Sequence, residues 1–161
     1  MKLPVTEVLW RIAKHTSLYK ATDLTGGGAK TTGGRWNSKG VSVVYTSTTI
    51  ALATLETMAH LGDINIRNAF LAKVAVPQAV WDLREYVEAN DFDPTWLAEP
   101  PGSTSINYGD DWLRGLTAPL LMVPSAIIPE EYNVLVNPVH PLSRKITSTV
   151  LRQYIYDPRF A

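Results

Sequence analysis

The chain has 161 residues, 45% of them hydrophobic, and its fifteen Lys and Arg residues balance fifteen Asp and Glu residues, so its formal net charge is zero. This length favours one compact domain over residues 1–161, and the neutral charge argues against direct binding of nucleic acid, which usually relies on a positive field. The sequence contains no cysteine, which excludes disulfides, thiolate nucleophiles and zinc–thiolate sites.

The first predicted feature is an N-terminal segment without the marks of a membrane or export signal. Pro4, Glu7 and Arg11 interrupt its apolar residues, so it has neither a signal-peptide core nor the length of a membrane span. We therefore expect a soluble, cytoplasmic protein with no membrane partner.

A glycine-rich loop is followed by the clearest local prediction, a strand and then a helix. Residues 41–46 are β-branched enough for a strand. Ser47 or Thr48 can cap a helix that continues to Leu61 and ends at Gly62.

Later segments complete an α+β pattern. Three apolar runs that end at a proline predict strands over residues 69–76, 120–123 and 132–136. Residues 87–115 are polar and predict a partly helical excursion over the sheet, and residues 150–161 alternate enough to form a last edge strand. We expect a single domain with a mixed or antiparallel sheet flanked by helices.

Glu56 is the first candidate site residue. Helical spacing places it in one stripe with Thr49, Ala53 and His60. The ordinary interpretation is a solvated carboxylate that pairs with His60 at i,i+4. However, the helix carries no other charged residue, which is typical of a helix buried on several sides, and a buried carboxylate needs partners or a function.

Two arginines could bind an anion. Arg35 follows two glycines, which allow close approach of a ligand, and its guanidinium can fork onto a phosphate or carboxylate. The alternative for Arg35 is stacking on Trp36. Arg11 lies among apolar neighbours, and its alternative is to extend over a core tryptophan.

Tyr45 and Ser125 are candidates with structural alternatives. Tyr45 alternates with Val41 and Val43, so it can be a core tyrosine. Ser125 ends a very apolar strand, where its hydroxyl can satisfy backbone groups.

Several well-known catalytic motifs do not occur. The glycines form neither G-x-G-x-x-G nor G-x-x-x-x-G-K-[ST], no H-E-x-x-H is present, and Ser125 lacks a G-x-S-x-G context. The three histidines are scattered, so we expect no metal site.

The chain nevertheless resembles one known family along nearly its whole length. The blocks are WR near the N-terminus, GGRWNSKGVSVVYTS, ALATLE, VPSAIIPEEYNVLVNPVHP and a closing DPRF. They resemble the RES domain family, named for its arginine, glutamate and serine. The resemblance implies the toxin of a type II toxin–antitoxin pair, a fold like the ADP-ribosyltransferase toxins, and consumption of NAD. It points to Arg11, Arg35, Tyr45, Glu56 and Ser125.

These residue types suit the chemistry of NAD cleavage. Breaking the nicotinamide–ribose bond passes through a cationic, oxocarbenium-like sugar, by analogy with glycoside hydrolysis. We expect Glu56 to stabilise that cation, Arg11 and Arg35 to bind the phosphates or the adjacent ribose, and Tyr45 to contact nicotinamide. Ser125 would position a ribose, an arginine or Glu56.

The acceptor of ADP-ribose stays open between water, phosphate and a protein side chain. NAD degradation, which arrests growth, is the first hypothesis and protein ADP-ribosylation the second. Two other classes are a non-catalytic subunit that docks an antitoxin and an inert scaffold. The resemblance implies an Xre-type helix-turn-helix antitoxin as partner, which would supply any DNA contacts, and it leaves a homodimer open.

Overall fold

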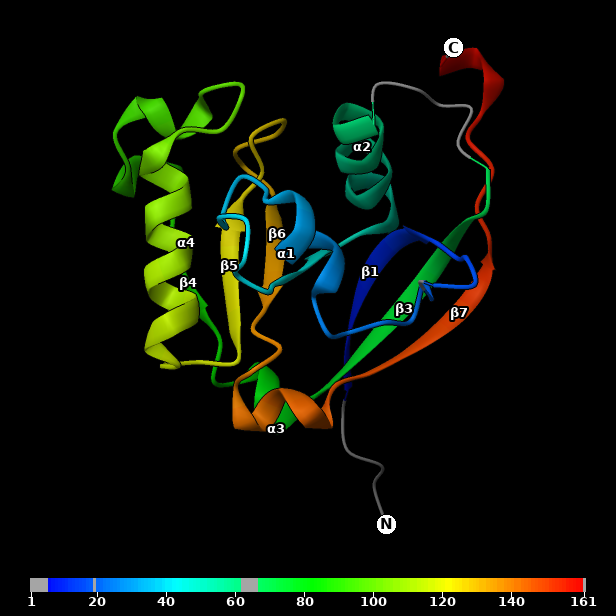
Figure 1. The fold of residues 1–161 in the computed structure, drawn as a ribbon, viewed down its shortest axis with the longest axis horizontal. Coiled ribbons are helices and arrows are strands. Elements are labelled where there is room, and N and C mark those ends of the chain that lie inside the picture. The colour runs from blue at the N-terminus through cyan, green and yellow to red at the C-terminus, as the bar shows by residue number, and fades with distance from the viewer. Residues whose placement is uncertain (1–5, 19, 62–66, 161) are drawn as a thin grey trace.

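The computed structural model describes residues 6–18, 20–61 and 67–160, and within them seven strands form one sheet (Figure 1). The spatial order is β4-β5-β6-β2-β1-β3-β7. The strands are β1 (Thr6–Lys14), β2 (Val44–Ser47), β3 (Ala69–Pro77), β4 (Glu85–Tyr86), β5 (Leu120–Pro124), β6 (Tyr132–Val136) and β7 (Thr147–Gln153). The β4–β5 pair is parallel and the other pairs are antiparallel. This mixed sheet confirms the predicted α+β class.

Helices flank the sheet. The α-helices are α1 (Gly27–Thr32), α2 (Ile50–Leu61), α3 (Gln78–Trp81) and α4 (Ser103–Gly115), and the 3-10 helices are η1 (Ala89–Asp91), η2 (Pro94–Leu97), η3 (Pro141–Lys145) and η4 (Pro158–Phe160). Figure 1 shows α4 running alongside β5, whereas α2 lies on the side of the molecule where the C-terminus is drawn. The predicted excursion thus comprises η1, η2 and α4. No helix in the described ranges has the length and apolarity needed to cross a bilayer.

Two apolar cores lie on opposite faces of the sheet, because side chains alternate along each strand. On β6, Val134 and Val136 belong to the first core and Leu135 to the second. Residues of α3 and Ile146 complete the first core. Three tryptophans, Trp36, Trp96 and Trp112, complete the second.

The N-terminal strand was not predicted. β1 lies between β2 and β3 and pairs with β3 along its whole length, from Thr6 opposite Pro77 to Lys14 opposite Ala69. Glu7 and Arg11 interrupt its apolar pattern, so the local sequence by itself does not predict a strand. Its pairing partners on both sides supply the order that the local pattern lacks.

The predicted strand over residues 41–46 begins too early. β2 starts at Val44, because the preceding residues form a turn in which the Val41 N–H donates to the Ser38 carbonyl oxygen. Gly40 has a φ of 93°, which favours glycine. The prediction that Val41, Val43 and Tyr45 share one side is confirmed, since all three pack in the second core.

The predicted cap of α2 is also wrong. Thr49 caps the helix, since its hydroxyl accepts from the Leu52 N–H at 3.1 Å. The Ser47 hydroxyl instead donates to Asn133 Oδ1, and the Thr48 hydroxyl donates to the Tyr132 carbonyl oxygen. The predicted stop at Gly62 lies outside the described residues.

The predicted C-terminal strand is displaced along the chain. β7 is the edge strand beside β3, but it spans Thr147–Gln153. The Tyr154 N–H still donates to the Ala69 carbonyl oxygen of β3 at 2.8 Å, and the Tyr154 hydroxyl meets that of Thr54 on α2. The backbone contact with β3 therefore ends at Tyr154, whose side chain packs against α2. The predictions for β3, β5 and β6 are confirmed to within one residue.

Candidate active site

Glu56 lies half-buried on α2 and uses one carboxylate oxygen for two hydrogen bonds. Its Oε1 accepts from Ser125 Oγ at 2.6 Å and from Asn133 Nδ2 at 2.7 Å. No hydrogen bond among the described residues reaches its Oε2, and no ion pair there joins it to His60. The carboxylate is thus anchored through one oxygen.

Ser125 is fully buried directly after β5 and has a fixed hydroxyl. Its Oγ accepts from the backbone N–H groups of Ile127 and Ile128, each at 3.1 Å, and donates to Glu56. The Ser125 N–H donates to the Glu131 carbonyl oxygen at 2.9 Å. The residue therefore closes the loop between β5 and β6 and ties it to α2.

Two polar residues that the sequence did not mark as site residues complete this cluster. Ser47 on β2 lies opposite Asn133 on β6 in the antiparallel register, and Ser47 Oγ donates to Asn133 Oδ1 at 2.7 Å. Both occur in the sequence blocks that resemble the RES family. The available signal was an asparagine inside an otherwise apolar strand, where asparagine is disfavoured.

Tyr45 faces the second core, with its hydroxyl in two hydrogen bonds. The phenol donates to Asn37 Oδ1 at 2.7 Å and accepts from the Trp36 N–H at 3.0 Å. A Cβ at Gly34 would lie 2.7 Å from this oxygen, so the approach requires glycine. Burial raises the pKa of the Tyr45 phenol, Asp110 adds to the shift, and the Trp36 N–H and Arg35 oppose it.

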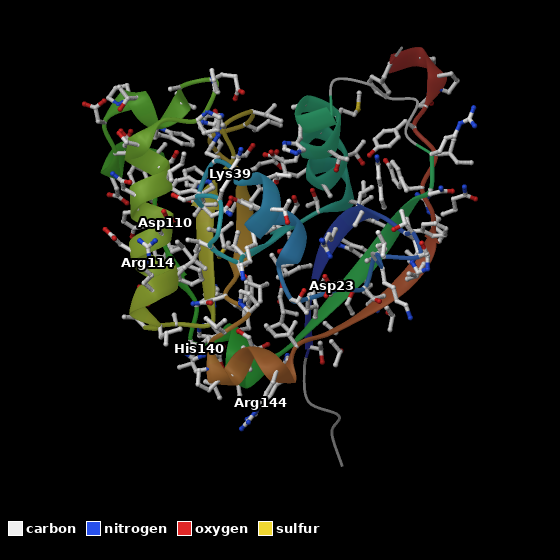
Figure 2. The ribbon with its side chains drawn as sticks, in the orientation of Figure 1. Asp23, Lys39, Asp110, Arg114, His140 and Arg144 are labelled. Carbon is white, nitrogen blue, oxygen red and sulfur yellow. The ribbon has the colours of Figure 1, made fainter. Side chains whose placement is uncertain are left out.

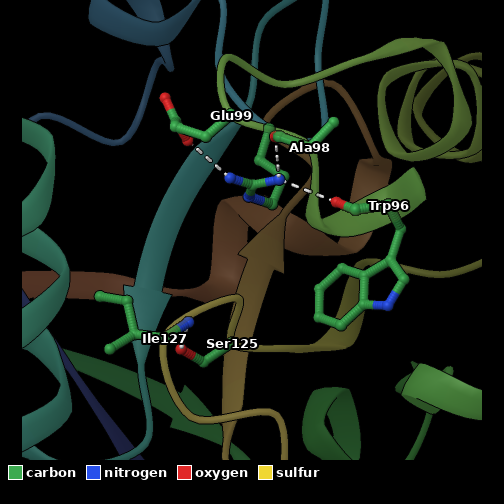
Figure 3. A network of polar contacts seen from close by, with 6 residues as sticks. Trp96, Ala98, Glu99, Ser125 and Ile127 are labelled. Atoms are coloured by element: carbon green, nitrogen blue, oxygen red, sulfur yellow. Dashed lines mark hydrogen bonds and ion pairs between the residues drawn. The ribbon is translucent and has the colours of Figure 1, made fainter. Parts of the chain in front are cut away.

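Arg35 joins the glycine-rich loop to the excursion (Figure 3). Its guanidinium donates to the carbonyl oxygens of Trp96 and Ala98 at 2.8 and 3.0 Å, and pairs with Glu99 at 2.9 Å. The side chain is 16% exposed, whereas that of Glu99 is 77% exposed. Arg35 is therefore mostly enclosed, with its ionic partner at the surface. Figure 3 draws these contacts and Ser125 in one close view.

The segment that carries Arg35 also packs against α4. Asp110 is buried, and its carboxylate accepts from the backbone N–H of Ser38 at 2.9 Å and from the Ser38 hydroxyl. Figure 2 shows Asp110 on α4 and Lys39 on the loop beside it. The helix thus holds the loop between Gly34 and Gly40 in place.

Arg11 has hydrogen-bond partners of its own, in the 21–23 segment. It alternates with Trp10 on β1 and shares the face of Leu9, a first-core residue. Its guanidinium donates to the Asp23 carbonyl oxygen at 2.6 Å and to that of Ala21 at 3.4 Å. Burial lowers its pKa and the Asp23 charge opposes that shift, but arginine stays cationic.

The five predicted residues therefore form three groups. Glu56 and Ser125 are in direct contact, Tyr45 and Arg35 flank Trp36, and no hydrogen bond within the described ranges links Arg11 to the other four. An open hollow of about 470 Å³ is lined by Leu18, Lys20, Thr22, Asp23, Thr25 and Gly27, and none of the five predicted residues lines it. The hydrogen-bonded cluster around Glu56 is the better candidate site, because Ser125 and Asn133 anchor its carboxylate.

Ligation of a metal has little support from the side chains. No group of three or more His, Asp or Glu residues gathers anywhere in the described ranges. The cluster around Glu56 combines one carboxylate with neutral donors, which suits stabilisation of a cationic sugar.

Comparison with known proteins gives the family. The RES domain model matches residues 8–157. The chain is 43% identical over 156 residues to the Prs ADP-ribosylating toxin of Sphingobium sp. (strain YBL2), covering 96% of this chain and 97% of that protein. It is 33% identical over 154 residues to Toxin Res of Yersinia enterocolitica, covering 94% and 98%, and 33% identical over 138 residues to Toxin Res of Pseudomonas putida, covering 83% and 86%. This chain belongs to the RES domain family.

Proposed function

We propose that the chain is an NAD-consuming toxin that cleaves the bond between nicotinamide and ribose. The observation that carries the proposal is the carboxylate of Glu56, which Ser125 and Asn133 hold through Oε1 while no residue in the described part of the chain hydrogen-bonds to Oε2. The names of relatives, which include a toxin that ADP-ribosylates, support both the toxic role and the use of NAD.

In the proposed reaction the bond between ribose C1′ and the nicotinamide nitrogen breaks. Nicotinamide leaves as a neutral base with the bonding electron pair, so no strong general acid is required. Glu56 stabilises the positive charge that develops on the sugar. An acceptor oxygen then bonds to C1′, and its proton passes to solvent.

The remaining predicted residues keep the roles proposed from sequence, with one refinement. Arg35 would bind a phosphate of NAD in exchange for its exposed partner Glu99, because the ion pair between them is open to water and therefore weak. The hydroxyl of Tyr45 is already bonded to Asn37 and Trp36, so its ring is the part that remains to contact nicotinamide. Arg11 is the residue whose proposed contact with NAD has the least support, since its guanidinium is bound to the 21–23 segment.

The acceptor divides the proposal into two candidates. With water or phosphate as acceptor, the protein depletes NAD. With a protein side chain as acceptor, it is an ADP-ribosyltransferase, and the name of the relative at 43% identity favours this candidate specifically. Both candidates share the cleavage step at Glu56.

The test is the time course of NAD loss with purified protein, with and without phosphate, beside the Glu56→Gln variant. We expect Glu56→Gln to lower turnover at least about 100-fold, while the exposed Glu130→Gln control keeps full activity. Phosphate dependence identifies a phosphorylase, and label transfer from NAD to lysate protein identifies a transferase. Equal turnover in Glu56→Gln would remove Glu56 from the mechanism.

The proposed partner is an Xre-type helix-turn-helix antitoxin. The balanced charge of this chain leaves contacts with DNA to that partner. If the toxic activity and the partner surface are separate, Glu56→Gln will abolish growth arrest and still copurify with the antitoxin. Loss of both together would place Glu56 within the antitoxin contact.

A further inference from the structure

The environment of Asn133 gives its side chain an unusually fixed position. Asn133 lies on β6 between β2 and β5, so backbone ladders hold the strand on both sides. It is half-buried, and its register partners are Ser47 on one side and Val123 on the other. A side chain rooted in the middle of a sheet moves far less than one on a surface loop.

The chemistry of the contacts determines how the amide is turned. An ionised carboxylate only accepts hydrogen bonds, so the Nδ2 amino group must face Glu56. The Oδ1 atom then faces Ser47, whose hydroxyl donates to it. Turning the amide over would set two acceptors against each other at Glu56, so Glu56 determines the orientation, and the Ser47 hydroxyl, which can donate or accept, donates to the Oδ1 that faces it.

The same reasoning applies to Ser125, which is the second donor to Glu56. Its oxygen already accepts two backbone N–H groups, so its single proton is directed to Glu56. Both donors meet on Oε1. A glutamate on a helix has three rotatable side-chain bonds, and two donors that converge on one oxygen select one arrangement among the many available.

We propose that Asn133 is a positioning residue that fixes Glu56 Oε1 so that Oε2 is presented to the substrate. This inference rests on the proposed function, because it gives Oε2 the role of stabilising the cationic ribose. Asn133 acts through Glu56 and does not itself contact NAD. Ser47 holds the far side of the amide and completes a chain from β2 through β6 to α2.

The first test is Asn133→Ala, with kcat and KM for NAD measured separately. We expect kcat to fall about 10- to 100-fold, as for a misplaced catalytic group, and KM to change less than about threefold. The matched control is Asn107→Ala, which removes an exposed asparagine of α4. In a Glu56→Gln background, Asn133→Ala should lower the residual rate less than about threefold. A kcat within about twofold of the unaltered protein, or fully additive losses, would overturn the proposal.

The second test uses Asn133→Asp, which keeps the shape and the acceptor for Ser47 but replaces the donor by a carboxyl group. At neutral pH two carboxylates then face each other, and kcat should fall at least as far as in Asn133→Ala. At lower pH the pair shares one proton, which restores a donor to Glu56. The ratio of variant to unaltered kcat should therefore rise from about pH 7.5 to about pH 5. A flat ratio would refute the proposal, since a purely structural asparagine gives no such recovery.

A separate readout distinguishes this inference from the proposed function. If the unaltered protein consumes no NAD and transfers no ADP-ribose, the proposed function fails. A crystal structure of Asn133→Ala then decides the positioning role alone. Displacement of the Glu56 carboxylate from Ser125 supports it, and a carboxylate that stays 2.6 Å from Ser125 Oγ, as in the unaltered protein, overturns it.

Discussion

Gly109 offers a sharp test of how α4 packs against the segment that carries Arg35. A Cβ added at this position would lie 1.8 Å from the carbonyl oxygen of Trp36 and 2.7 Å from its carbonyl carbon. Both atoms belong to backbone, so no flexible side chain can move aside. We therefore expect Gly109→Ala to destabilise the protein, although alanine is the better helix former.

The expected magnitude follows from opposing effects. Alanine in a helix interior gains about 1 kcal/mol over glycine. Against this, the Trp36 carbonyl oxygen, at 1.8 Å from the added Cβ, must retreat by more than about 1 Å to reach an allowed contact, and overpacking of this kind costs about 1–3 kcal/mol. Retreat also strains the bonds from Ser38 to the buried carboxylate of Asp110, each of which contributes about 1.5–3 kcal/mol. We expect the free energy of unfolding to fall by about 2–4 kcal/mol.

Urea unfolding followed by tryptophan fluorescence measures this effect, with a midpoint that falls by about 1–2 M. The control is Gly115→Ala at the end of the same helix, where the nearest atom to an added Cβ is Thr117 Cγ2 at 3.9 Å. That variant should keep or slightly raise the midpoint. Equal midpoints for the two variants would show that α4 does not rest on the Trp36 backbone as described.

Two further predictions concern residues of the candidate site. Ser125→Ala leaves two backbone N–H groups without an acceptor and removes one donor from Glu56. The free energy of unfolding should therefore fall by about 1–3 kcal/mol, and NAD turnover should fall with it. A variant with an unchanged melting temperature would contradict the buried role of the hydroxyl. For Tyr45, burial raises the pKa of the folded phenol, so this group contributes stability that is fully present below the pKa of the unfolded chain, about 10, and is lost as the pH rises above it. Its share of that decline is up to about 1.4 kcal/mol per pH unit, and Tyr45→Phe should have a shallower alkaline decline in urea unfolding. Identical slopes for the two proteins would show that Tyr45 titrates normally.

The predictable part of the fold is the part that local pattern specifies. β3, β5 and β6 are apolar runs that end near a proline, and α2 is a long segment rich in alanine and leucine. β1 escaped prediction because Glu7 and Arg11 break its pattern, and its place depends on pairing with residues more than fifty positions away. Strand order is a non-local property that periodicity does not carry.

The candidate site divides along the same line. Residue types and the resemblance of sequence blocks drew attention to Glu56 and Ser125, but their contact spans 69 positions of the chain and that of Glu56 with Asn133 spans 77.

By itself, the sequence determined the neutral charge, the main strands and helix of the core, and the presence of an acidic side chain on an apolar helix. Only the tertiary structure decided that two donors meet on one oxygen of that side chain, that Arg35 is tied to the excursion, and that Arg11 donates to the Asp23 carbonyl oxygen. The physical reason is that β-sheet register and the packing of α2 bring together groups whose separation along the chain holds no local signal.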